Sequence, residues 1–270
     1  MTSTSLSQPP APQPAPWKPQ FLHHMTCMQS PEFVFSTLSR APKGSFPPFL
    51  PRARYCIFRG FWGELRSHEA NSAELNEEIF GSDLLTFTTD CRMEKVGEIC
   101  DGGSFGGGVG AGAGGGGPCE AVWWVREEMV QWRVKGVAFV VGGKEDGEMR
   151  SVKKEVGKWM RVLKDEGKEN WSWEKEVTAH FGNLSPGMRG SFSGPPPGQP
   201  VDKPYDDKFH PVGDKVHDLN DPVARENFRV VIIKPETVES VDLSDPIKAR
   251  RQLYRFDDGT GEWSHQELWP

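Results

Sequence analysis

Short segments rich in aromatic and β-branched residues recur along the chain, and turns separate most of them instead of long helices. Such a succession, with few strand–helix–strand crossovers, favours a mainly antiparallel sheet over a doubly wound fold. A small closed barrel with peripheral helices suits it, because closure removes the sheet edges. The expected strands are 32–39, 53–63, 84–90, two within 120–143 joined by a turn near 126–129, two within 227–243 joined at Lys234–Pro235–Glu236, and a final hairpin around "DDGTGE".

Helical patterns are fewer and shorter. The segment "WKPQFLHHMTCM" (17–28) predicts a short helix, 71–83 one or two helical turns, and "VGEIC" (96–100) the start of another helix. From 149 to 163, apolar residues recur at helical spacing with charges between them, which predicts an amphipathic helix.

The composition predicts one folded domain with flexible inserts. Residues 1–16 are rich in Ser, Thr, Pro and Gln and predict a disordered tail, which leaves 17–270 as a single domain. Three inserts are expected in it, at about 101–118 (glycine-rich), 144–170 and 199–226.

Charge and hydropathy exclude several classes of protein. A formal net charge of −6 gives no basic surface for nucleic acid, and no apolar run approaches the length of a membrane span. The first residues resemble neither a secretory signal nor a transit peptide. Five cysteines without a Cys-x-x-Cys pair indicate reduced thiols. We therefore expect a cytoplasmic protein that binds neither nucleic acid nor membrane.

Most motifs with catalytic meaning are missing. The glycine tract repeats too uniformly for a phosphate-binding loop, and the histidines show no metal-ligand spacing, so no metal site is predicted. His23 and His24 are adjacent and would face different ways on a helix. No Gly-x-Ser-x-Gly elbow or recognisable carboxylate pair occurs.

Basic residues at strand ends are more informative, above all around "FTTDCRMEK" (87–95). Arg92 and Lys95 follow the third strand, and a helix begins just beyond Thr88 and Thr89. Arginine forks, lysine charges, threonine hydroxyls and the amides of a helix start all suit a phosphate. On spacing alone, solvated strand ends explain the same residues.

The order of these pieces resembles the pyridoxamine 5′-phosphate oxidase-like flavoproteins, and within them the branch known as the Alr4036-type FMN-binding domain. The matching segments run from about Trp17 to Pro270. They are "PW" (16–17), "RARYCIFRGF" (52–61), "TDCRMEK" (89–95), "EAVWW" (120–124), "REEMVQWRVKG" (126–136), "LSPGMRGSFSGPPPG" (184–198) and the two C-terminal strand segments.

This resemblance implies an FMN-binding split barrel, with FMN at the interface of a homodimer. It places Arg54 on the phosphate, Lys95 and its neighbour Arg92 near FMN, and Arg251 near the isoalloxazine of the second subunit. The full set of implied cofactor-binding residues is Arg54, Ile57, Phe58, Arg59, Thr88, Thr89, Arg92, Lys95, Gln131 and Arg251. The implied function is an FMN-binding protein and flavin-dependent oxidoreductase, with no catalytic residue, substrate or electron donor assigned.

Some positions depart from the family pattern. Met93 replaces a serine of the motif, and Glu94 stands where the vitamin-B6 oxidases carry a second arginine. Ile247 and Ala249 replace an Arg-x-His pair that holds pyridoxal phosphate in those oxidases, so pyridoxamine 5′-phosphate oxidase activity itself is not expected. The alternative is a non-catalytic barrel that has lost flavin and acts in protein interaction. A haem-binding relative ranks lower, because no axial histidine stands out.

Overall fold

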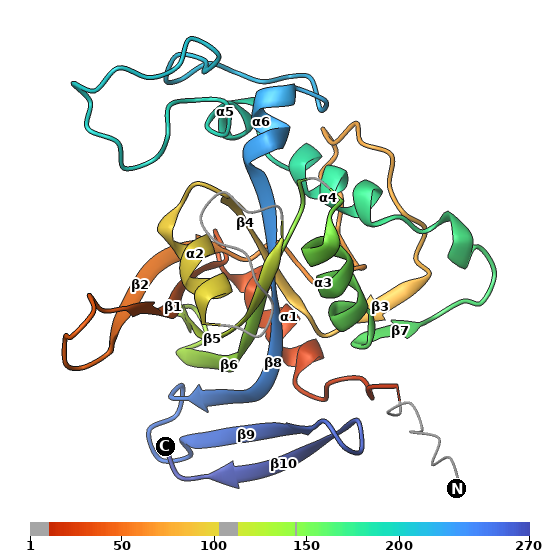
Figure 1. Cartoon of the computed structure of the whole chain (residues 1–270). Helices are drawn as coiled ribbons and strands as arrows, with labels where there is room; N and C mark the ends of the chain where they lie inside the picture. Colours follow the sequence, from red (N-terminus) through yellow and green to blue (C-terminus); the bar gives the residue numbers. More distant parts are fainter. Residues whose placement is uncertain (1–10, 103–112, 144) are drawn as a thin grey trace, which may run out of the picture.

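A computed structural model describes residues 11–102, 113–143 and 145–270. The core of the predicted glycine-rich insert and most of the predicted tail lie outside these residues. The described parts are mainly antiparallel sheet with short helices, as expected (Figure 1). No helix in them is long and apolar enough to cross a membrane.

The main sheet is built around one long strand. Its order is β10-β9-β8-β6-β5-β1-β2, and β4 also pairs with β8. The strands are β1 (Glu32–Arg40), β2 (Phe49–Ile57), β4 (Leu85–Asp90), β5 (Gly114–Val125), β6 (Val130–Val141), β8 (Phe228–Asp242), β9 (Arg250–Asp257) and β10 (Glu262–Leu268). All their pairings are antiparallel. A second, two-stranded sheet pairs β3 (Phe80–Ser82) with β7 (Met160–Val162).

The helices cover the sheet and close its ends. They are α1 (Lys18–Cys27), α2 (Glu94–Asp101), α3 (Gly147–Gly157), α4 (Trp173–Gly182), α5 (Pro186–Gly190) and α6 (Pro222–Asn227), with a short 3₁₀ helix at Lys168–Asn170. In Figure 1, α3 and α4 lie to one side of β8 and α2 to the other. The β9–β10 hairpin lies at the opposite end from α5 and α6.

Two apolar clusters hold these layers together. The first packs α1 against the sheet, and Phe21 makes edge contacts with Phe58, Trp123 and Trp132. The second joins α3 and α4 to the other face of β6 and β8. Burying large aromatic side chains contributes about 1.5–3 kcal/mol each, so these clusters fix the sheet that carries the site.

The segment predicted as two strands over 227–243 is one continuous strand, so the turn expected at Lys234–Pro235–Glu236 is wrong. Pro235 lies opposite Gly136 at a shift of register between β6 and β8. On its other side, pairing with β4 ends at Ile233 and pairing with β9 begins at Thr237. Proline lacks an N–H, and here it occupies a point where neither neighbour needs one.

Three other boundaries differ from the prediction. The helix expected over 149–163 ends at Gly157, and 160–162 instead pair with β3. The turns expected in 71–83 form no helix, and that segment ends in β3. The second strand begins at Phe49 rather than 53, because an edge strand tolerates the prolines of this stretch.

Candidate functional site

A pocket of about 310 Å³ lies where β2 and β4 end and α2 begins. Its other wall is α5 with the loop that follows. The chain just past β2 is tied to β4, because Arg59 N–H donates to Thr86 O at 2.8 Å and Trp62 N–H donates to Leu84 O at 2.9 Å. The lining residues are Tyr55, Cys56, Ile57, Arg59, Thr88, Thr89, Asp90, Met93, Lys95, Met188, Ser191, Phe192 and Pro197.

Lys95 is the central cation of this pocket. Its Nζ donates to the Thr89 hydroxyl at 3.2 Å and lies 2.7 Å from Met93 Sδ. Within the described parts of the chain it forms no ion pair with a carboxylate. Burial lowers the pKa of Lys95, so its charge is poorly solvated. An incompletely solvated ammonium beside hydroxyl groups is suited to an anion.

Arg59, just past the end of β2, supplies a second cation of this pocket. Its guanidinium contacts Met188 Sδ at 3.9 Å, and its Nε is buried without a hydrogen-bond partner among the described residues. Burial lowers the pKa of Arg59 as well. Burial, with a smaller effect of the charge on Arg59, lowers the pKa of the His180 imidazole. Arg59 is therefore positioned by packing, and no carboxylate in the described structure pairs with it.

Arg54, the expected phosphate ligand, does not line this pocket. Its guanidinium donates to Glu98 Oε2 and to the Thr37 hydroxyl, each at 2.5 Å. The Glu98 side chain is 6 % exposed and also accepts from Thr37. Burying this carboxylate without a cation would be costly, so α2 and β2 hold Arg54 in place as its partner.

Arg92 is also engaged within the chain. It makes a forked pair with Asp90, at 2.9 and 2.6 Å, and donates to the carbonyls of Gly194 and Phe192. Asp90 is buried at the end of β4. Arg92 thus ties β4 to the loop after α5, where it shapes the pocket without lining it.

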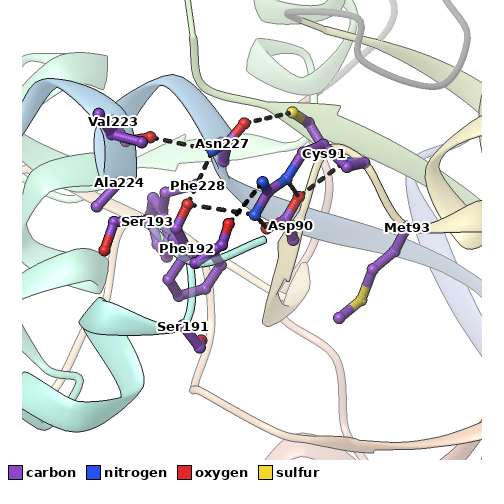
Figure 2. Close-up of polar contacts among 12 residues, drawn as sticks. Asp90, Cys91, Met93, Ser191, Phe192, Ser193, Val223, Ala224, Asn227 and Phe228 are labelled. Carbon is purple, nitrogen blue, oxygen red and sulfur yellow. Dashed lines mark hydrogen bonds and ion pairs between the residues drawn. The ribbon is translucent and has the colours of Figure 1, made fainter. Parts of the chain in front are cut away.

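A neighbouring polar cluster fixes the same loop. Figure 2 shows Asn227 between Cys91, Phe192 and Val223. The Asn227 amide donates to Phe192 O at 2.8 Å and to Val223 O at 3.1 Å. Phe192 therefore lines the pocket from a backbone that α6 and β4 both hold.

Some of the other expected site residues line the pocket, and the rest lie elsewhere in the fold. Ile57, Thr88 and Thr89 line the pocket. Phe58 lies in the first apolar cluster. Gln131, on β6, pairs with Trp124 across the hairpin. Arg251, on β9, donates to Glu239 on β8 at 2.8 Å. The structure therefore brings together Ile57, Arg59, Thr88, Thr89 and Lys95, and places Arg54, Phe58, Arg92, Gln131 and Arg251 outside the pocket.

The wall formed by Met188, Ser191, Phe192 and Pro197 was missing from the predicted site residues. These residues fall in "LSPGMRGSFSGPPPG", which the sequence comparison singled out only for its order. The role of Glu98 was also missed, since nothing in its local pattern indicates a partner 44 residues earlier in the chain.

A larger pocket, of about 680 Å³, lies between the end of β6, α3 and the start of α4. Trp171, Trp173 and Arg225 line it together with several acids. Its cation Lys153 is already paired with Glu145. The larger pocket also holds Arg225, whose Nη1 is buried without a hydrogen-bond partner among the described residues. Three carboxylates, Glu145, Glu169 and Glu174, share its lining and would repel a phosphate.

Comparison with solved structures identifies the fold. A pyridoxamine 5′-phosphate oxidase-related, FMN-binding protein from Nostoc punctiforme aligns with a TM-score of 0.58 and 19 % identity, over 96 % of this chain and 100 % of that chain. PhzG from Burkholderia lata, in complex with tetrahydrophenazine-1-carboxylic acid, aligns with a TM-score of 0.43 and 14 % identity, over 100 % and 98 %. General Stress Protein 26 from Bacillus anthracis gives 0.31 and 11 %, over 82 % and 93 %.

Sequence comparison points the same way over the first half of the chain. A search of curated protein sequences finds no significant match. The sequence model of the family described as "Pyridoxamine 5′-phosphate oxidase, FMN-binding domain" matches residues 14–142, which include β1 to β6 and most of the candidate pocket. The resemblance to the pyridoxamine 5′-phosphate oxidase-like family that was predicted from the sequence is thereby confirmed over residues 14–142.

Proposed function

We propose that the protein binds FMN and that the FMN phosphate lies in the pocket between Lys95 and Arg59. The observation that carries this proposal is Lys95, a half-buried ammonium with a hydroxyl and a thioether as its hydrogen-bond partners. Burial disfavours its charge, and a phosphate would compensate for the lost solvation. The match to an FMN-binding family over residues 14–142 supports FMN phosphate as the anion.

The residues of the pocket fit a phosphate. Lys95 offers a compact charge and Arg59 a donor fork whose Nε is buried and unpartnered. Thr88 and Thr89 offer hydroxyls, and the first turn of α2 adds backbone N–H groups and a favourable dipole. A volume of about 310 Å³ is at the small end of the ~300–1,000 Å³ usual for ligand pockets. The phosphate end of FMN is therefore proposed to be enclosed and the remainder to lie toward the rim.

The proposed cradle is smaller than the resemblance implies. Arg54 and Arg92 are neutralised by Glu98 and Asp90, so they act by positioning α2 and the loop after α5. Met93 brings sulfur rather than a hydroxyl to the pocket. Lys95 and Arg59 then supply the positive charge, and each is expected to contribute more to phosphate binding than it would in a site with four cations.

We also propose that the strands close into a split barrel and that the protein forms a homodimer. The backbone bonds between the segment after β2 and β4 support a closed ring of strands. At the pocket rim, Tyr55 is 79 % exposed, and Phe49 and Leu50 on the same strand are also exposed. A second copy covering this rim would bury these side chains and complete the flavin site. Analytical ultracentrifugation should then show a dimer. A monomer that still binds FMN would refute the proposed homodimer and leave the proposed FMN site standing.

Bound FMN would supply hydride or electron transfer, which makes the protein a flavin-dependent oxidoreductase. The chain's own residues would bind and orient the FMN. Lys95 and Arg59 hold the negative charge, and Phe192 and Met188 exclude water from one side. Thr89 donates weakly to Asp90 O at 3.5 Å while accepting from Lys95, so it fixes the direction of the ammonium.

Titration of the flavin-free protein with FMN, followed by flavin fluorescence, tests the proposal. Lys95→Met should weaken binding about 10- to 100-fold, because a charge-assisted hydrogen bond contributes about 1.5–3 kcal/mol. Lys154→Met is the matched control, since Lys154 is exposed on α3, far from the pocket lining. Equal FMN affinities for the wild type and Lys95→Met would refute the proposed cradle.

A second candidate is a flavin-free module that acts in protein interaction. It is favoured by the internal pairs Arg54–Glu98 and Arg92–Asp90, which neutralise two expected phosphate ligands. Under this alternative the purified protein is colourless, and added FMN at micromolar concentration leaves the flavin fluorescence unchanged. Arg54→Met would then lower stability only.

A further inference from the structure

A second cluster of ligating side chains lies away from the flavin pocket, where α1 meets the turn between β5 and β6. His23 and Cys27 belong to α1, and Glu128 belongs to the turn. One ligand atom from each of the three lies within 4.8 Å of the other two. We propose that His23, Cys27 and Glu128 form a binding site for a divalent transition metal of the Zn²⁺ class.

The spacing on α1 creates one half of this site. Residues four apart lie on the same face of a helix, one turn above the other. His23 and Cys27 have this spacing, and both lie on the outer face of α1, exposed and half-buried respectively. The sequence interpretation found no metal-ligand spacing, because the third ligand comes from a segment a hundred residues later.

The orientation of α1 is fixed by the adjacent histidine. His24 is buried, and its Nδ1 accepts a hydrogen bond from Trp132 Nε1 at 2.9 Å. Phe21 and Met25 on the same face are buried in the first apolar cluster. Neighbouring helix residues are about 100° apart, so anchoring His24 to β6 turns His23 toward the outside. The helix cannot rotate His23 away without breaking a buried hydrogen bond.

The turn that carries Glu128 is also held in one conformation. Met129 has a φ of 53°, a left-handed backbone that non-glycine residues seldom adopt. Its carbonyl accepts from Leu243 N–H at 3.0 Å, and its N–H donates to Arg126 O at 3.3 Å. Such a conformation persists only where the surroundings impose it. Glu128, the preceding residue, is thereby presented to α1.

Charge around the cluster favours a cation. Burial and the carboxylates of Glu128 and Glu127 raise the pKa of the Cys27 thiol. A divalent cation would reverse this effect: the metal–sulfur bond forms as the S–H bond breaks, and the proton leaves to solvent. Imidazole nitrogen, thiolate and carboxylate together select zinc-like metals over Ca²⁺ or Mg²⁺. With three protein ligands, a tetrahedral ion keeps one position for water.

The geometry is compatible with such an ion after small side-chain rotations. Metal–ligand bonds of about 2.0–2.3 Å require ligand atoms about 3.5 Å apart in a tetrahedral site. Closing from within 4.8 Å needs shifts of roughly 1 Å, which the side chains of His23 and Glu128 can make. The bound ion would clamp α1 to the β5–β6 hairpin.

Titration of the full chain with Co²⁺ tests the site, because a cobalt–thiolate bond gives a charge-transfer absorption in the near ultraviolet. The wild type should show this band at one equivalent, and Zn²⁺ should remove it by competition. Cys27→Ser should abolish the band, and His23→Gln and Glu128→Gln should each weaken binding at least about tenfold. His68→Gln and Cys56→Ser are the controls, since neither residue belongs to the cluster.

A thermal melt gives a second readout that needs no chromophore. Zn²⁺ at saturating concentration should raise the melting temperature of the wild type and of both controls, but not that of Cys27→Ser. A cobalt band that survives in Cys27→Ser, or a wild type without a band, would overturn the proposal. None of these outcomes depends on whether FMN binds.

Discussion

His180 makes a strong prediction about the pH dependence of stability. Its side chain is 1 % exposed and stacks on Trp62 with ring planes 8° apart. Burial, with a smaller effect of the charge on Arg59, lowers the pKa of His180 to about 3 from an ordinary value of 6.5. Glu176 Oε1 lies 4.0 Å from Nε2, but the low pKa means that the imidazole is neutral and the two form no ion pair at neutral pH.

The magnitude follows from proton linkage. Below pH 6.5 the unfolded chain takes up a proton at His180, whereas the folded protein does not until the pH approaches 3. The unfolded state therefore binds more protons in this window, and stability falls as the pH falls. Between about pH 8 and about pH 5 the loss from this group is about 2 kcal/mol.

A substitution at His180 measures how much this imidazole contributes to the pH dependence of stability. His180→Phe keeps an aromatic ring against Trp62 and removes the titrating group, so the variant should lose about 2 kcal/mol less than the wild type over the same pH range. Burial raises the pKa of Glu176, which opposes the effect of His180 because that group favours folding as pH falls. Glu176 keeps its bonds to Gly63 N and Asn76 in both proteins, so its effect largely cancels in the comparison.

The assay is urea unfolding followed by tryptophan fluorescence at several pH values. His217→Gln, which changes an exposed imidazole, is the control and should keep the wild-type pH dependence. The reasoning fails if His180→Phe loses as much stability on acidification as the wild type. It also fails if the wild type gains stability relative to the variant, because His180 would then be protonated in the fold and paired with Glu176.

Two further substitutions test the sheet that carries the site. Gly136→Ala should destabilise the fold by about 3 kcal/mol or more in urea unfolding, because an added Cβ would lie 1.9 Å from the Lys234 carbonyl oxygen. Gly157→Ala is the control: its Cβ would have nothing within 4 Å, so the change should be neutral or slightly stabilising. Equal destabilisation by the two substitutions would contradict the reasoning. Trp132→Phe should lower the free energy of unfolding by about 2–3 kcal/mol and make α1 more mobile, because it leaves His24 Nδ1 buried without its hydrogen-bond donor. Unchanged amide hydrogen exchange in α1 would show that this bond does not fix the helix.

Local sequence patterns predicted most strands because their signals are local. The apolar residues and threonines of 84–90 define β4, and the break at 126–129 defines the β5–β6 turn. The pattern failed at Pro235, where proline usually ends a strand. Whether a proline is tolerated depends on which neighbouring strands need its N–H, and the topology of β4, β6 and β9 decides that.

The sequence predicted where the candidate site lies, but only some of the residues that line it. Thr88, Thr89 and Lys95 follow from a strand end and a helix start, which are adjacent in sequence. Arg54 had the same chemical suitability for phosphate. Its partner Glu98 lies on the side of α2 that faces β2, and no spacing within either segment reveals that contact.

The distribution of carboxylates therefore decides which cations can receive an anion. Four basic residues lie near the start of α2, and two of them are neutralised by buried acids: Arg54 by Glu98 and Arg92 by Asp90. Removing either acid would leave a half-buried guanidinium unpaired, so the two pairs are stable parts of the scaffold. Lys95 and Arg59 remain with thioether and hydroxyl neighbours, and these two face the same pocket. A phosphate entering it meets positive charge that the fold has not already neutralised. The loss of Lys95 should therefore weaken FMN binding more than the loss of Arg54.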